Sequence, residues 1–388
     1  MINIAVVTST RAEFGLLMPL IRELRKFEDE NTKIELVVTG THLLEEYGHT
    51  IDEIVSLDYR IDRVIYVPVI SDTAIDISMN QAEFLIKFTE LFIDKKYSAI
   101  VILGDRYEML SIAIAAGNTH TPIFHLCGGD TTEGAIDEWI RHSITKMSYL
   151  HFPTNEESYY RIIQLGEEPK RVFNYGSTSI DNIINLSNMQ KSDVLKSIGL
   201  EECKYAVCTY HPVTMDNSDV DEMIYNFLEA IKHTPEIEFI VTKSNADQGG
   251  THINELLDAS QSDIRNLHVF TSLGTVRYLS LMKFAEFVIG NSSSGIIETP
   301  AFRIPTINIG DRQRGRLQSK SIINCSTDSE SIIAAIKKAR SSIFKEICKT
   351  VISPYGDGHA AEHIASKIID VVNEDKIDLK KKFYDFGV

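Results

Sequence analysis

The sequence has little cysteine and no excess of basic residues. Its five cysteines are scattered through 388 residues, and none belongs to a Cys-x-x-Cys pair. This usage predicts a reduced, cytoplasmic chain and gives no support to a disulfide framework or a zinc cluster. Acidic residues outnumber basic residues 55 to 39, for a formal net charge of −16. The balance argues against nucleic acid as a partner, but a few well-placed arginines can still create a local anion site.

Long apolar segments are lacking as well. No apolar run approaches the roughly 18 residues of a membrane span, so we expect no membrane partner. The N-terminus MINIAVVTST has no basic region ahead of its apolar stretch, unlike a signal peptide. With 43% hydrophobic and 24% charged residues the composition is that of a globular protein, and the length predicts about two domains.

Short runs rich in valine and isoleucine alternate with longer amphipathic segments almost from end to end. In the first half we expect strands at residues 2–8, 34–39, 99–103, 122–126, 149–153 and 172–175. In the second half we expect strands at residues 205–210, 237–242, 267–271, 287–289 and 306–309. Continuous apolar strands separated by helices are typical of parallel sheets covered on both faces. The fold class is therefore α/β.

The pattern also predicts two domains of similar size. The polar stretch at residues 185–203 is the best candidate for a passage between them. We expect an N-terminal Rossmann-like domain at residues 1–180, completed by residues 369–388, and a C-terminal Rossmann-like domain at residues 181–368. The basic and aromatic end of the chain, KIDLKKKFYDFGV, is the segment expected to return to the first domain.

In open parallel sheets, ligands bind beyond the carboxyl ends of the strands. Neither G-x-G-x-x-G nor G-x-x-x-x-G-K-[ST] occurs, so a nicotinamide, flavin or NTPase enzyme loses its main support. The first strand ends instead in TSTRAE, whose hydroxyls can cap the next helix and whose Arg11 can meet an anion. An ordinary helix cap with a solvated arginine explains this turn equally well.

Carboxylates gather after two further strands. Asp105 and Arg106 follow the run ILG, where burial makes a charge costly unless it is paired or used. An ion pair between these neighbours is the simpler explanation, but adjacent side chains rarely face each other well. In HLCGGDTTEGAIDEWIRH, Asp130 and the helix-opening Asp137 and Glu138 crowd one turn. Ordinary helix salt bridges account for some of them, yet such crowding also separates the pKa values of acids and bases.

A metal site has weak support in this segment. Glu138 and His142 lie four residues apart on one helix face, but two ligands without a third are poor evidence. We therefore predict no metal and no cofactor.

The second half carries hydroxyls and amides rather than acids. His211 follows one strand, where a satisfied strand-end histidine is as good an explanation as a ligand contact, and Asn245 follows the next. In FVIGNSSSGIIETPAF a strand is followed by Gly290, three serines, Gly295 and a helix expected to begin near Ile296. Free helix N–H groups with serine hydroxyls can bind an anion, although a well-capped helix needs only one serine.

Three more side chains belong to the predicted anion site. Glu298, about one turn into the helix, can accept hydrogen bonds from ribose hydroxyls. Arg312 and Arg316 follow the next strand in TINIGDRQRGR and are suitable neighbours of a diphosphate.

With these segments in place, the chain resembles the hydrolysing UDP-N-acetylglucosamine 2-epimerases, including bacterial enzymes of sialic and legionaminic acid biosynthesis. The matching segments run in order through nearly the whole chain: TRAEFG, VTGTH, LGDRYE, GGDTTEGAIDE, IRHSITKMS, HPVT, SNAD, GNSSSGIIE and INIGDRQRGR. The resemblance implies a glycosyltransferase-B-like architecture of two Rossmann-like domains facing across a cleft. The second domain would bind UDP and the first would supply the chemistry.

The resemblance also implies roles for individual residues. Asp105 and Asp137 fall on catalytic carboxylates. The substrate-binding positions are Arg11, Arg106, Asp181, His211, Asn245, Ser292, Ser293, Gly295, Glu298 and Arg312. Some family members have HIEGG with a functional glutamate where this chain has HLCGG, so Cys127 takes that place. We name Asp130 and Glu138 as the catalytic carboxylates that compensate.

The implied reaction converts UDP-N-acetylglucosamine and water to N-acetylmannosamine and UDP through a 2-acetamidoglucal. The expected partners are the UDP-sugar and UDP, in a homodimer or homotetramer. The nearest alternative substrate is the UDP-N,N'-diacetylbacillosamine of legionaminic acid biosynthesis. A retaining UDP-sugar glycosyltransferase and a UDP-sugar sensor without catalysis are alternatives of other classes.

Overall fold

The computed structural model describes residues 1–45, 48–68, 73–131, 136–186, 188–210, 220–243, 250–271, 273–374 and 376–385. Contacts between Cα atoms divide the chain into two compact units. Unit 1 comprises Met1–Asp181 and Gly358–Val388, and unit 2 comprises Asn182–Asp357. The sequence placed the return of the chain at residue 369. The return begins earlier in the structure, because the whole buried face of α15 (Ala360–Asn373) packs within unit 1, against α1 (Arg11–Arg25).

Unit 1 is a six-stranded sheet in the order β3-β2-β1-β4-β5-β6, with every neighbouring pair parallel. Its strands are β1 (Ile2–Thr8), β2 (Thr32–Thr39), β3 (Arg63–Ile65), β4 (Ala99–Leu103), β5 (Ile123–Leu126) and β6 (Leu150–Phe152). This is the strand order of a Rossmann fold, whose topological switch point lies between β1 and β4. A ligand site is expected there.

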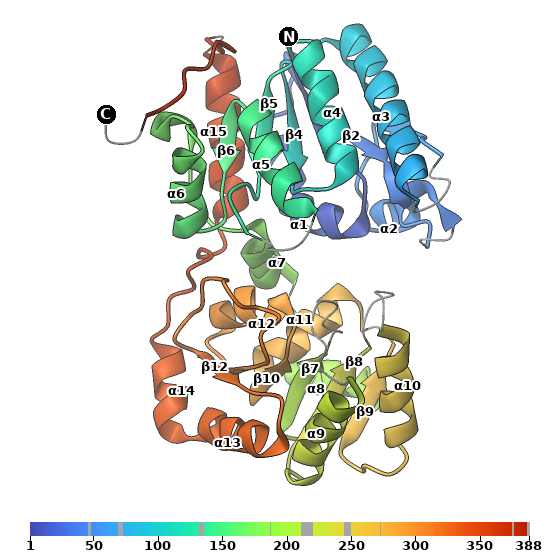
Figure 1. The fold of residues 1–388 in the computed structure, drawn as a ribbon, viewed down its shortest axis with the longest axis vertical. Helices are drawn as coiled ribbons and strands as arrows, with labels where there is room; N and C mark the ends of the chain where they lie inside the picture. The colour runs from blue at the N-terminus through green and yellow to red at the C-terminus, as the bar shows by residue number, and fades with distance from the viewer. Residues whose placement is uncertain are drawn as a thin grey trace. The chain divides into compact units, whose positions relative to one another are not determined.

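Helices cover this sheet in two groups (Figure 1). The helices α3 (Ala74–Lys95), α4 (Tyr107–Asn118) and α5 (Asp137–Met147) pack side by side, whereas α1 packs with α15. The remaining helical segments are η1 (Gly40–Leu43), α2 (Ile51–Ser56), α6 (Glu156–Gln164), η3 (Pro169–Arg171) and α7 (Thr178–Leu186), which ends in unit 2. Aromatic side chains of α3, among them Phe84 and Phe88, bury against the apolar strands and form the core of the unit.

Unit 2 repeats the same topology. Its parallel sheet has the order β12-β11-β10-β7-β8-β9, which becomes the order of unit 1 when the strands are renumbered from β7. The strands are β7 (Tyr205–Thr209), β8 (Glu238–Thr242), β9 (Leu267–Phe270), β10 (Phe287–Gly290), β11 (Thr306–Ile309) and β12 (Ile322–Cys325). The helices are α8 (Lys191–Lys196), α9 (Val220–Lys232), α10 (Gly250–Ser260), α11 (Gly274–Phe284), α12 (Ser293–Ile297), η4 (Thr299–Phe302), α13 (Ser329–Arg340) and α14 (Ser342–Lys349). The predicted α/β class with two Rossmann-like domains is confirmed.

Three local expectations are corrected. Residues 172–175 do not form a strand; Val172 makes only an isolated bridge to His151. The sequence did not predict β3 and β12, which are short and partly exposed edge strands. The stretch at 185–203 is more ordered than a linker, since it contains the end of α7 and all of α8.

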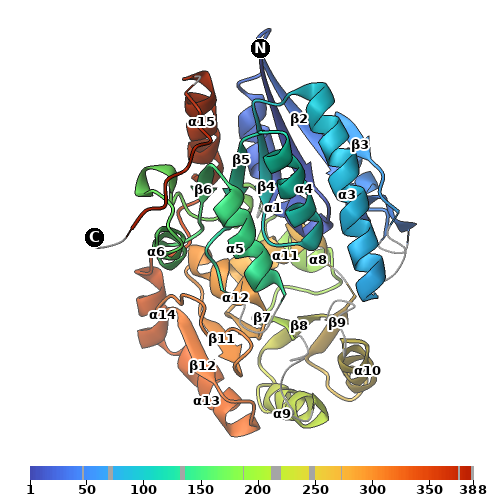
Figure 2. The same ribbon diagram turned by 45° about the horizontal axis from the view of Figure 1, so that its top comes forward.

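The C-terminal segment after α15 is fastened to unit 1. Figure 2 shows α15, in dark red, within the body of the blue and green elements that begin the chain. Lys381 Nζ donates to the carbonyl of Ser148 at 2.7 Å and forms an ion pair with Glu167. The N–H of Tyr384 donates to the carbonyl of Gly166 at 2.9 Å, and the Phe383 ring occupies the space that a Cβ at Gly166 would need.

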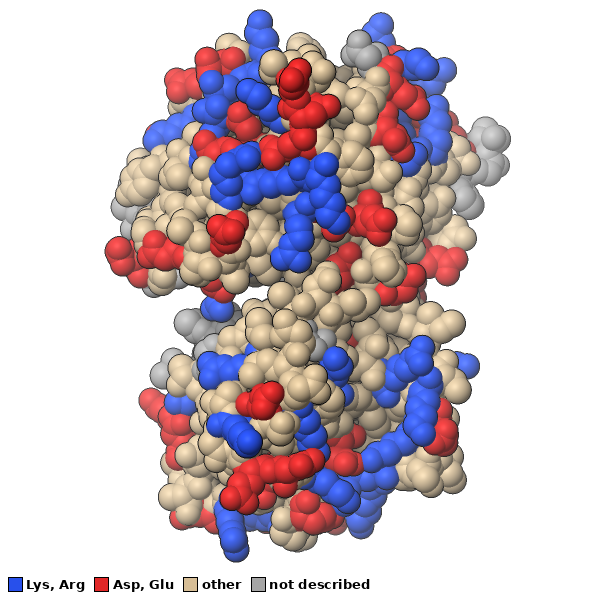
Figure 3. All heavy atoms as spheres, turned by 180° about the vertical axis from the view of Figure 1, so that it is seen from behind, with Lys and Arg blue, Asp and Glu red and all other residues tan. Residues whose placement is uncertain are grey.

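Acidic and basic side chains lie intermixed on the face of each unit that Figure 3 shows. Among the described residues, no helix combines the length and the apolar character needed to cross a membrane.

Candidate active site

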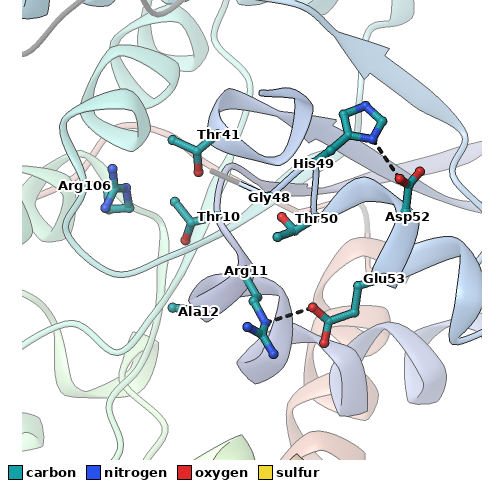
Figure 4. A pocket seen from close by; sticks show the side chains of 10 residues that line it. All are labelled: Thr10, Arg11, Ala12, Thr41, Gly48, His49, Thr50, Asp52, Glu53 and Arg106. Atoms are coloured by element: carbon teal, nitrogen blue, oxygen red, sulfur yellow. Dashed lines mark hydrogen bonds and ion pairs between the residues drawn. The ribbon is translucent and has the colours of Figure 1, made fainter. Parts of the chain in front are cut away.

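A cavity of about 530 Å³ lies beyond the carboxyl ends of β1, β2 and β4 in unit 1 (Figure 4). Its lining residues are Thr10, Arg11, Ala12, Thr41, Gly48, His49, Thr50, Asp52, Glu53 and Arg106. Two predicted binding residues, Arg11 and Arg106, therefore lie on one cavity. Arg11 Nε forms an ion pair with Glu53 Oε2 at 2.8 Å, and Figure 4 shows this pair at the rim.

The turn after β1 is both a helix cap and a cavity wall. Thr10 is the N-cap of α1: its hydroxyl accepts from the N–H of Glu13 at 3.3 Å. In return the Glu13 carboxylate accepts from the N–H of Thr10 at 3.1 Å, which completes a capping box. The cap fixes the backbone of the first turn of α1, so it also fixes the direction in which the Arg11 side chain leaves the helix. The helix-cap explanation is therefore confirmed, whereas anion binding by Arg11 stays a prediction.

Arg106 is paired with Glu108, not with its neighbour Asp105. Its Nε donates to Glu108 Oε1 at 2.8 Å, and Glu108 is almost fully buried at the start of α4. Burial and the charge of Glu108 raise the pKa of Glu13, which lies beside it, to about 7. The sequence analysis did not single out either glutamate. The capping-box spacing of Thr10 and Glu13 was the available signal for one of them.

The acidic cluster forms around Arg141 of α5, which was not among the predicted site residues. Only 3% of the Arg141 side chain is exposed. Its Nε donates to Asp105 Oδ2 at 2.9 Å, and its Nη1 donates to the carbonyl of Asp130 at 2.8 Å and to Glu138 Oε2 at 3.2 Å. A guanidinium with several donors in a fixed plane suits such a convergent arrangement. Arg141 therefore joins the end of β4, the turn after β5 and the first turn of α5.

Asp137 lies next to this cluster, half-buried in the first turn of α5. Burial, with a further contribution from the charge of Asp105, raises the pKa of Asp137 above its usual value. Asp105 is instead bound by Arg141 through two guanidinium nitrogens. Two neighbouring carboxyls in environments that differ in this way are the arrangement expected of an acid–base site.

The remaining groups near the turn after β5 have structural partners. The Asp130 carboxylate accepts from Ser158 Oγ at 2.5 Å and from Asn155 Nδ2 at 3.4 Å, both at the start of α6. Glu138 accepts from His142 Nε2 at 3.1 Å, as its spacing predicted. Burial, followed by the charge of Asp130, raises the pKa of the Cys127 thiol, so this residue is a protonated thiol rather than a base.

In unit 2 the serines after β10 form the start of α12. Ser292 is its N-cap and accepts from the N–H of Ser294 at 3.4 Å, so the helix begins at Ser293. The expectation of a start near Ile296 was wrong because the cap is the first serine of the run. Ser294 in the first turn donates to Glu298, whose pKa burial raises. Gly290 is required before the turn, since its φ is +138° and a Cβ would lie 2.1 Å from the Thr209 carbonyl oxygen.

Arg312 reaches the same place from the turn after β11. Its Nη1 donates to the carbonyl of Asn291 at 3.0 Å, and Gln313 Nε2 donates to the same oxygen at 2.9 Å. These two bonds hold the segment GDRQ against GNSSSG. Arg312 and Ser292 therefore lie close together, as an anion site requires.

One predicted binding residue does not join these sites in the described structure. Asp181 Oδ1 accepts from the N–H of Ala361 at 2.9 Å, so its carboxylate holds the N-terminus of α15. His211 and Asn245 lie outside the described residues. Within the described ranges, no group of three or more histidine, cysteine, aspartate or glutamate side chains is arranged to hold a metal ion.

The sequence and the fold were then compared with known proteins. The profile of the UDP-N-acetylglucosamine 2-epimerase family matches residues 25–369. The chain is 40% identical, over 99% of both chains, to a hydrolysing GDP/UDP-N,N'-diacetylbacillosamine 2-epimerase of Campylobacter jejuni. It is 35% identical, over 99% of this chain and 97% of the other, to the polysialic acid biosynthesis protein P7 of Escherichia coli.

Solved structures give the same result for the fold. The UDP-N-acetylglucosamine 2-epimerase of Neisseria meningitidis, solved with UDP-N-acetylglucosamine bound, superposes with a TM-score of 0.76 at 18% identity, covering 95% of this chain and all of the other. Its counterpart from Methanocaldococcus jannaschii, with UDP-N-acetylglucosamine and UDP, gives 0.72 at 18% identity, with the same coverage. Together with the matched profile, these likenesses show that the chain belongs to the UDP-N-acetylglucosamine 2-epimerase family.

Proposed function

We propose that the protein is a hydrolysing 2-epimerase that converts a UDP-activated 2-acetamido sugar and water to UDP and the free sugar inverted at carbon 2. The observation that carries the proposal is the pair Asp105 and Asp137. One carboxylate is bound to the buried Arg141, while burial and the first carboxylate raise the pKa of the other. A base with a raised pKa removes protons effectively near neutral pH.

The first step is an elimination. Asp137 removes the proton from carbon 2, the electron pair forms a double bond to carbon 1, and the C1–O bond breaks with its electrons remaining on UDP. Arg11 and Arg106, which line the cavity of unit 1, stabilise the charge that develops on the leaving diphosphate. In unit 2, Ser292 and Arg312 are the groups that we propose bind an anion. The neutral Cys127 thiol has no part in this proton transfer.

The second step adds water to the resulting 2-acetamidoglucal. The hydroxyl of water bonds to carbon 1, and a proton is delivered to carbon 2 on the face opposite to the one deprotonated first. Asp105 and Glu138 lie on either side of Arg141 and are the remaining acids available for this delivery. The acid that delivers this proton regains one from the attacking water molecule, and Asp137 releases its proton to solvent. The two steps together therefore consume one water molecule and leave each enzyme carboxyl as it began.

Two substrates are considered. The relatives at 40% and 30% identity are named for N,N'-diacetylbacillosamine, and a relative at 28% is named for UDP-N-acetylglucosamine. This ranking favours UDP-N,N'-diacetylbacillosamine and reverses the order that the sequence analysis gave. UDP-N-acetylglucosamine, with N-acetylmannosamine as its product, stays the second candidate because of the 35% relative from polysialic acid biosynthesis.

The test is to incubate the protein with each UDP-sugar in deuterated water and measure the released UDP and the sugar. We expect deuterium at carbon 2 of an inverted free sugar, with the higher kcat/KM for UDP-N,N'-diacetylbacillosamine. Transfer of the sugar to an acceptor would identify a glycosyltransferase instead. Binding without turnover would identify a sensor.

We also propose a homo-oligomer, a dimer or a tetramer, in the cytoplasm. One face of α3 supports association: Ile75, Met79, Ile86 and Ile93 are all more than half exposed and follow a near-heptad spacing. Replacing Ile86 with glutamate is expected to lower the mass measured by light scattering. An unchanged mass would exclude this face as the contact, and fractionation of cells tests the location.

A further inference from the structure

Unit 1 contains a buried pair of glutamates that the proposed reaction does not use. Glu13 of α1 and Glu108 of α4 have relative exposures of 4% and 1%. They are 95 residues apart in the sequence and are joined by Ser9, at the end of β1. Ser9 Oγ lies 2.8 Å from Glu13 Oε2 and 3.2 Å from Glu108 Oε1. The pair lies directly behind the two turns that carry Arg11 and Arg106 to the cavity.

The Ser9 hydroxyl cannot donate a hydrogen bond to two charged carboxylates at once. The hydroxyl has one hydrogen but lies within hydrogen-bond distance of both carboxylates, so one contact lacks a hydrogen. In addition, Glu13 Oε1 and Glu108 Oε2 are buried and have no hydrogen-bond partner among the residues that the structure describes. A buried charged oxygen without a partner is costly. One proton bound by the pair would supply the missing hydrogen and remove one of the two buried charges.

The surroundings decide which glutamate keeps the proton. Glu108 has a cationic partner, since Arg106 Nε donates to it at 2.8 Å. The donors to Glu13 within the described part of the chain are all neutral: the N–H groups of Ser9 at 2.7 Å and Thr10 at 3.1 Å, and the Ser9 hydroxyl. Burial, with the charge of Glu108, raises the pKa of Glu13 to about 7. Glu13 is therefore the neutral member of the pair.

Other titratable groups nearby do not change this assignment. His42 of η1 faces α1 through Phe14, and burial lowers its pKa to about 4, so it brings no positive charge. Asp137 of α5 is close enough to feel the charges of Arg106 and Glu108, but it is itself acidic. Arg106 is the cation that faces the pair, and Glu108 holds it.

We propose that Glu13 and Glu108 act as one carboxyl pair that shares a single proton, held by Glu13, and that this pair positions Arg106 and the Thr10–Arg11 turn for the UDP-sugar. The inference rests on the proposed function for its ligand. Glu13 acts through Ser9 and the capping box, and Glu108 acts through Arg106, so both are positioning residues and neither touches the substrate. A second charge on Glu13 would compete with Glu108 for Arg106 and draw its guanidinium away from the cavity.

The test compares two isosteric variants across pH. Glu13→Gln reproduces the neutral state, so at pH 6 its KM for the UDP-sugar is expected to stay within about threefold of the wild type. As pH rises from 6 to 9, the KM of the wild type is expected to increase and that of Glu13→Gln to stay level. Glu108→Gln releases Arg106 and is expected to raise KM at least tenfold at every pH, with a smaller change in kcat.

Glu167→Gln is the matched control for removing a buried carboxylate. Glu167 is fully buried in unit 1, but it is bound by Lys146 and Lys381 and lies away from the cavity. This variant is expected to lose stability without any change in the pH dependence of KM. Ser9→Ala tests whether the Ser9 hydroxyl couples the two glutamates, and it is expected to raise KM. Ser111→Ala is its control: the hydroxyl of this buried serine donates to the Tyr107 carbonyl of its own helix α4, so KM is expected to stay unchanged.

Infrared spectroscopy of the protein without ligand checks the proton directly. A protonated-carboxyl band is expected at pH 6 in the wild type and in Glu167→Gln, and it should be weaker in Glu13→Gln. Equal KM profiles for wild type and Glu13→Gln, an unchanged infrared band, or a Glu13→Gln variant that fails to fold would each overturn the proposal. Failure of the proposed function looks different: the infrared result would hold, but no UDP-sugar would be consumed.

Discussion

The two units share one topology but differ in the chemistry at the ends of their strands. In unit 1 the turns after β1, β4 and β5, and the helices that follow them, carry arginines and carboxylates, several of them buried, such as Arg141 and Glu108. In unit 2 the turns after β10 and β11 carry hydroxyls, amides and Arg312. The comparison teaches that the strand order provides a position for a site, whereas the side chains in the turns decide between proton transfer and anion binding.

The physical costs of the two arrangements also differ. A carboxyl that works as a base must be buried near another charge, so unit 1 needs internal counter-ions such as Arg141. A site that receives an anion needs only donors, and the first turn of α12 provides them. The next three predictions test this difference between the two units, in order of decreasing expected effect.

Replacing the carboxylates of unit 1 should abolish the chemistry and leave the binding of UDP. Asp137→Asn removes the proposed base, and Asp105→Asn removes the partner of the buried Arg141. We expect kcat to fall about 10²–10⁴-fold in each, the range that acid–base groups contribute. Release of UDP measures turnover, and calorimetry should give a Kd for UDP within about threefold of the wild type. Asp311→Asn, on an exposed turn of unit 2, is the control. Wild-type turnover in both variants would contradict the assignment of Asp137 as the base.

Replacing the cap of α12 in unit 2 should have the opposite effect. Ser292→Ala loses one hydroxyl at the anion site and the bond to the Ser294 N–H. We expect UDP to bind about tenfold more weakly, which is about 1.4 kcal/mol, with a smaller change in kcat. Ser341→Ala is a matched control, because Ser341 caps α14 of the same unit through the Phe344 N–H at 3.2 Å. It should cost about 1 kcal/mol of stability without any effect on UDP. Equal UDP affinities for Ser292→Ala and wild type would contradict the prediction.

The third contrast concerns stability against pH. Burial and Glu108 raise the pKa of Glu13 to about 7, and burial raises the pKa of Glu298 in unit 2, where Ser294 opposes the shift. A raised carboxyl pKa favours the folded state fully at pH below about 4.5, and this stability is lost as pH rises through the folded value. The apparent Tm should therefore fall by a few degrees between pH 5 and 8.

Thermal unfolding of the single variants assigns this loss to the two units. Glu13→Gln should reduce the pH dependence more than Glu298→Gln, because only Glu13 has a second carboxylate beside it. Glu167 affects the pH dependence of stability in the opposite direction. Burial opposes its ionisation, but His151, Lys146 and Lys381 lower the pKa of Glu167 to about 2. Its contribution is present above about pH 4.5 and disappears as pH falls toward 2, so Glu167→Gln should not reduce the loss between pH 5 and 8. A larger effect for Glu298→Gln than for Glu13→Gln would contradict the assignment.

Much of the fold was predictable because central parallel strands are continuous apolar runs. β1, β4 and β11 begin and end at the predicted residues, and the helix α5 begins at Asp137 as predicted. The edge strands β3 and β12 were missed because each is no more than four residues long and partly exposed. Strand pairing depends on partners far away in the sequence, and the local pattern of 172–175 contains no information about whether one exists.

The candidate site was predictable to a similar degree. A position after a predicted strand was enough to single out Asp105, Asp137, Ser292 and Arg312, because ligands bind beyond the carboxyl ends of strands in open parallel sheets. The partners of these groups were not predictable, because Arg141 binds Asp105 across 36 residues and Glu108 meets Ser9 across 99. The sequence therefore indicated where chemistry is placed, whereas the structure was needed to show which charges are held by which counter-ion.

The path of the chain has a consequence for how the protein is made. Unit 2 is inserted into unit 1, whose helix α15 and the segment after it, with Lys381 on Glu167 and Tyr384 on Gly166, are synthesised after unit 2. Domains usually fold in order of synthesis. Here the middle of the chain can fold first, while the opening half waits for its closing helix. A stop codon before residue 358 would thus spare the later-synthesised unit and damage the earlier one.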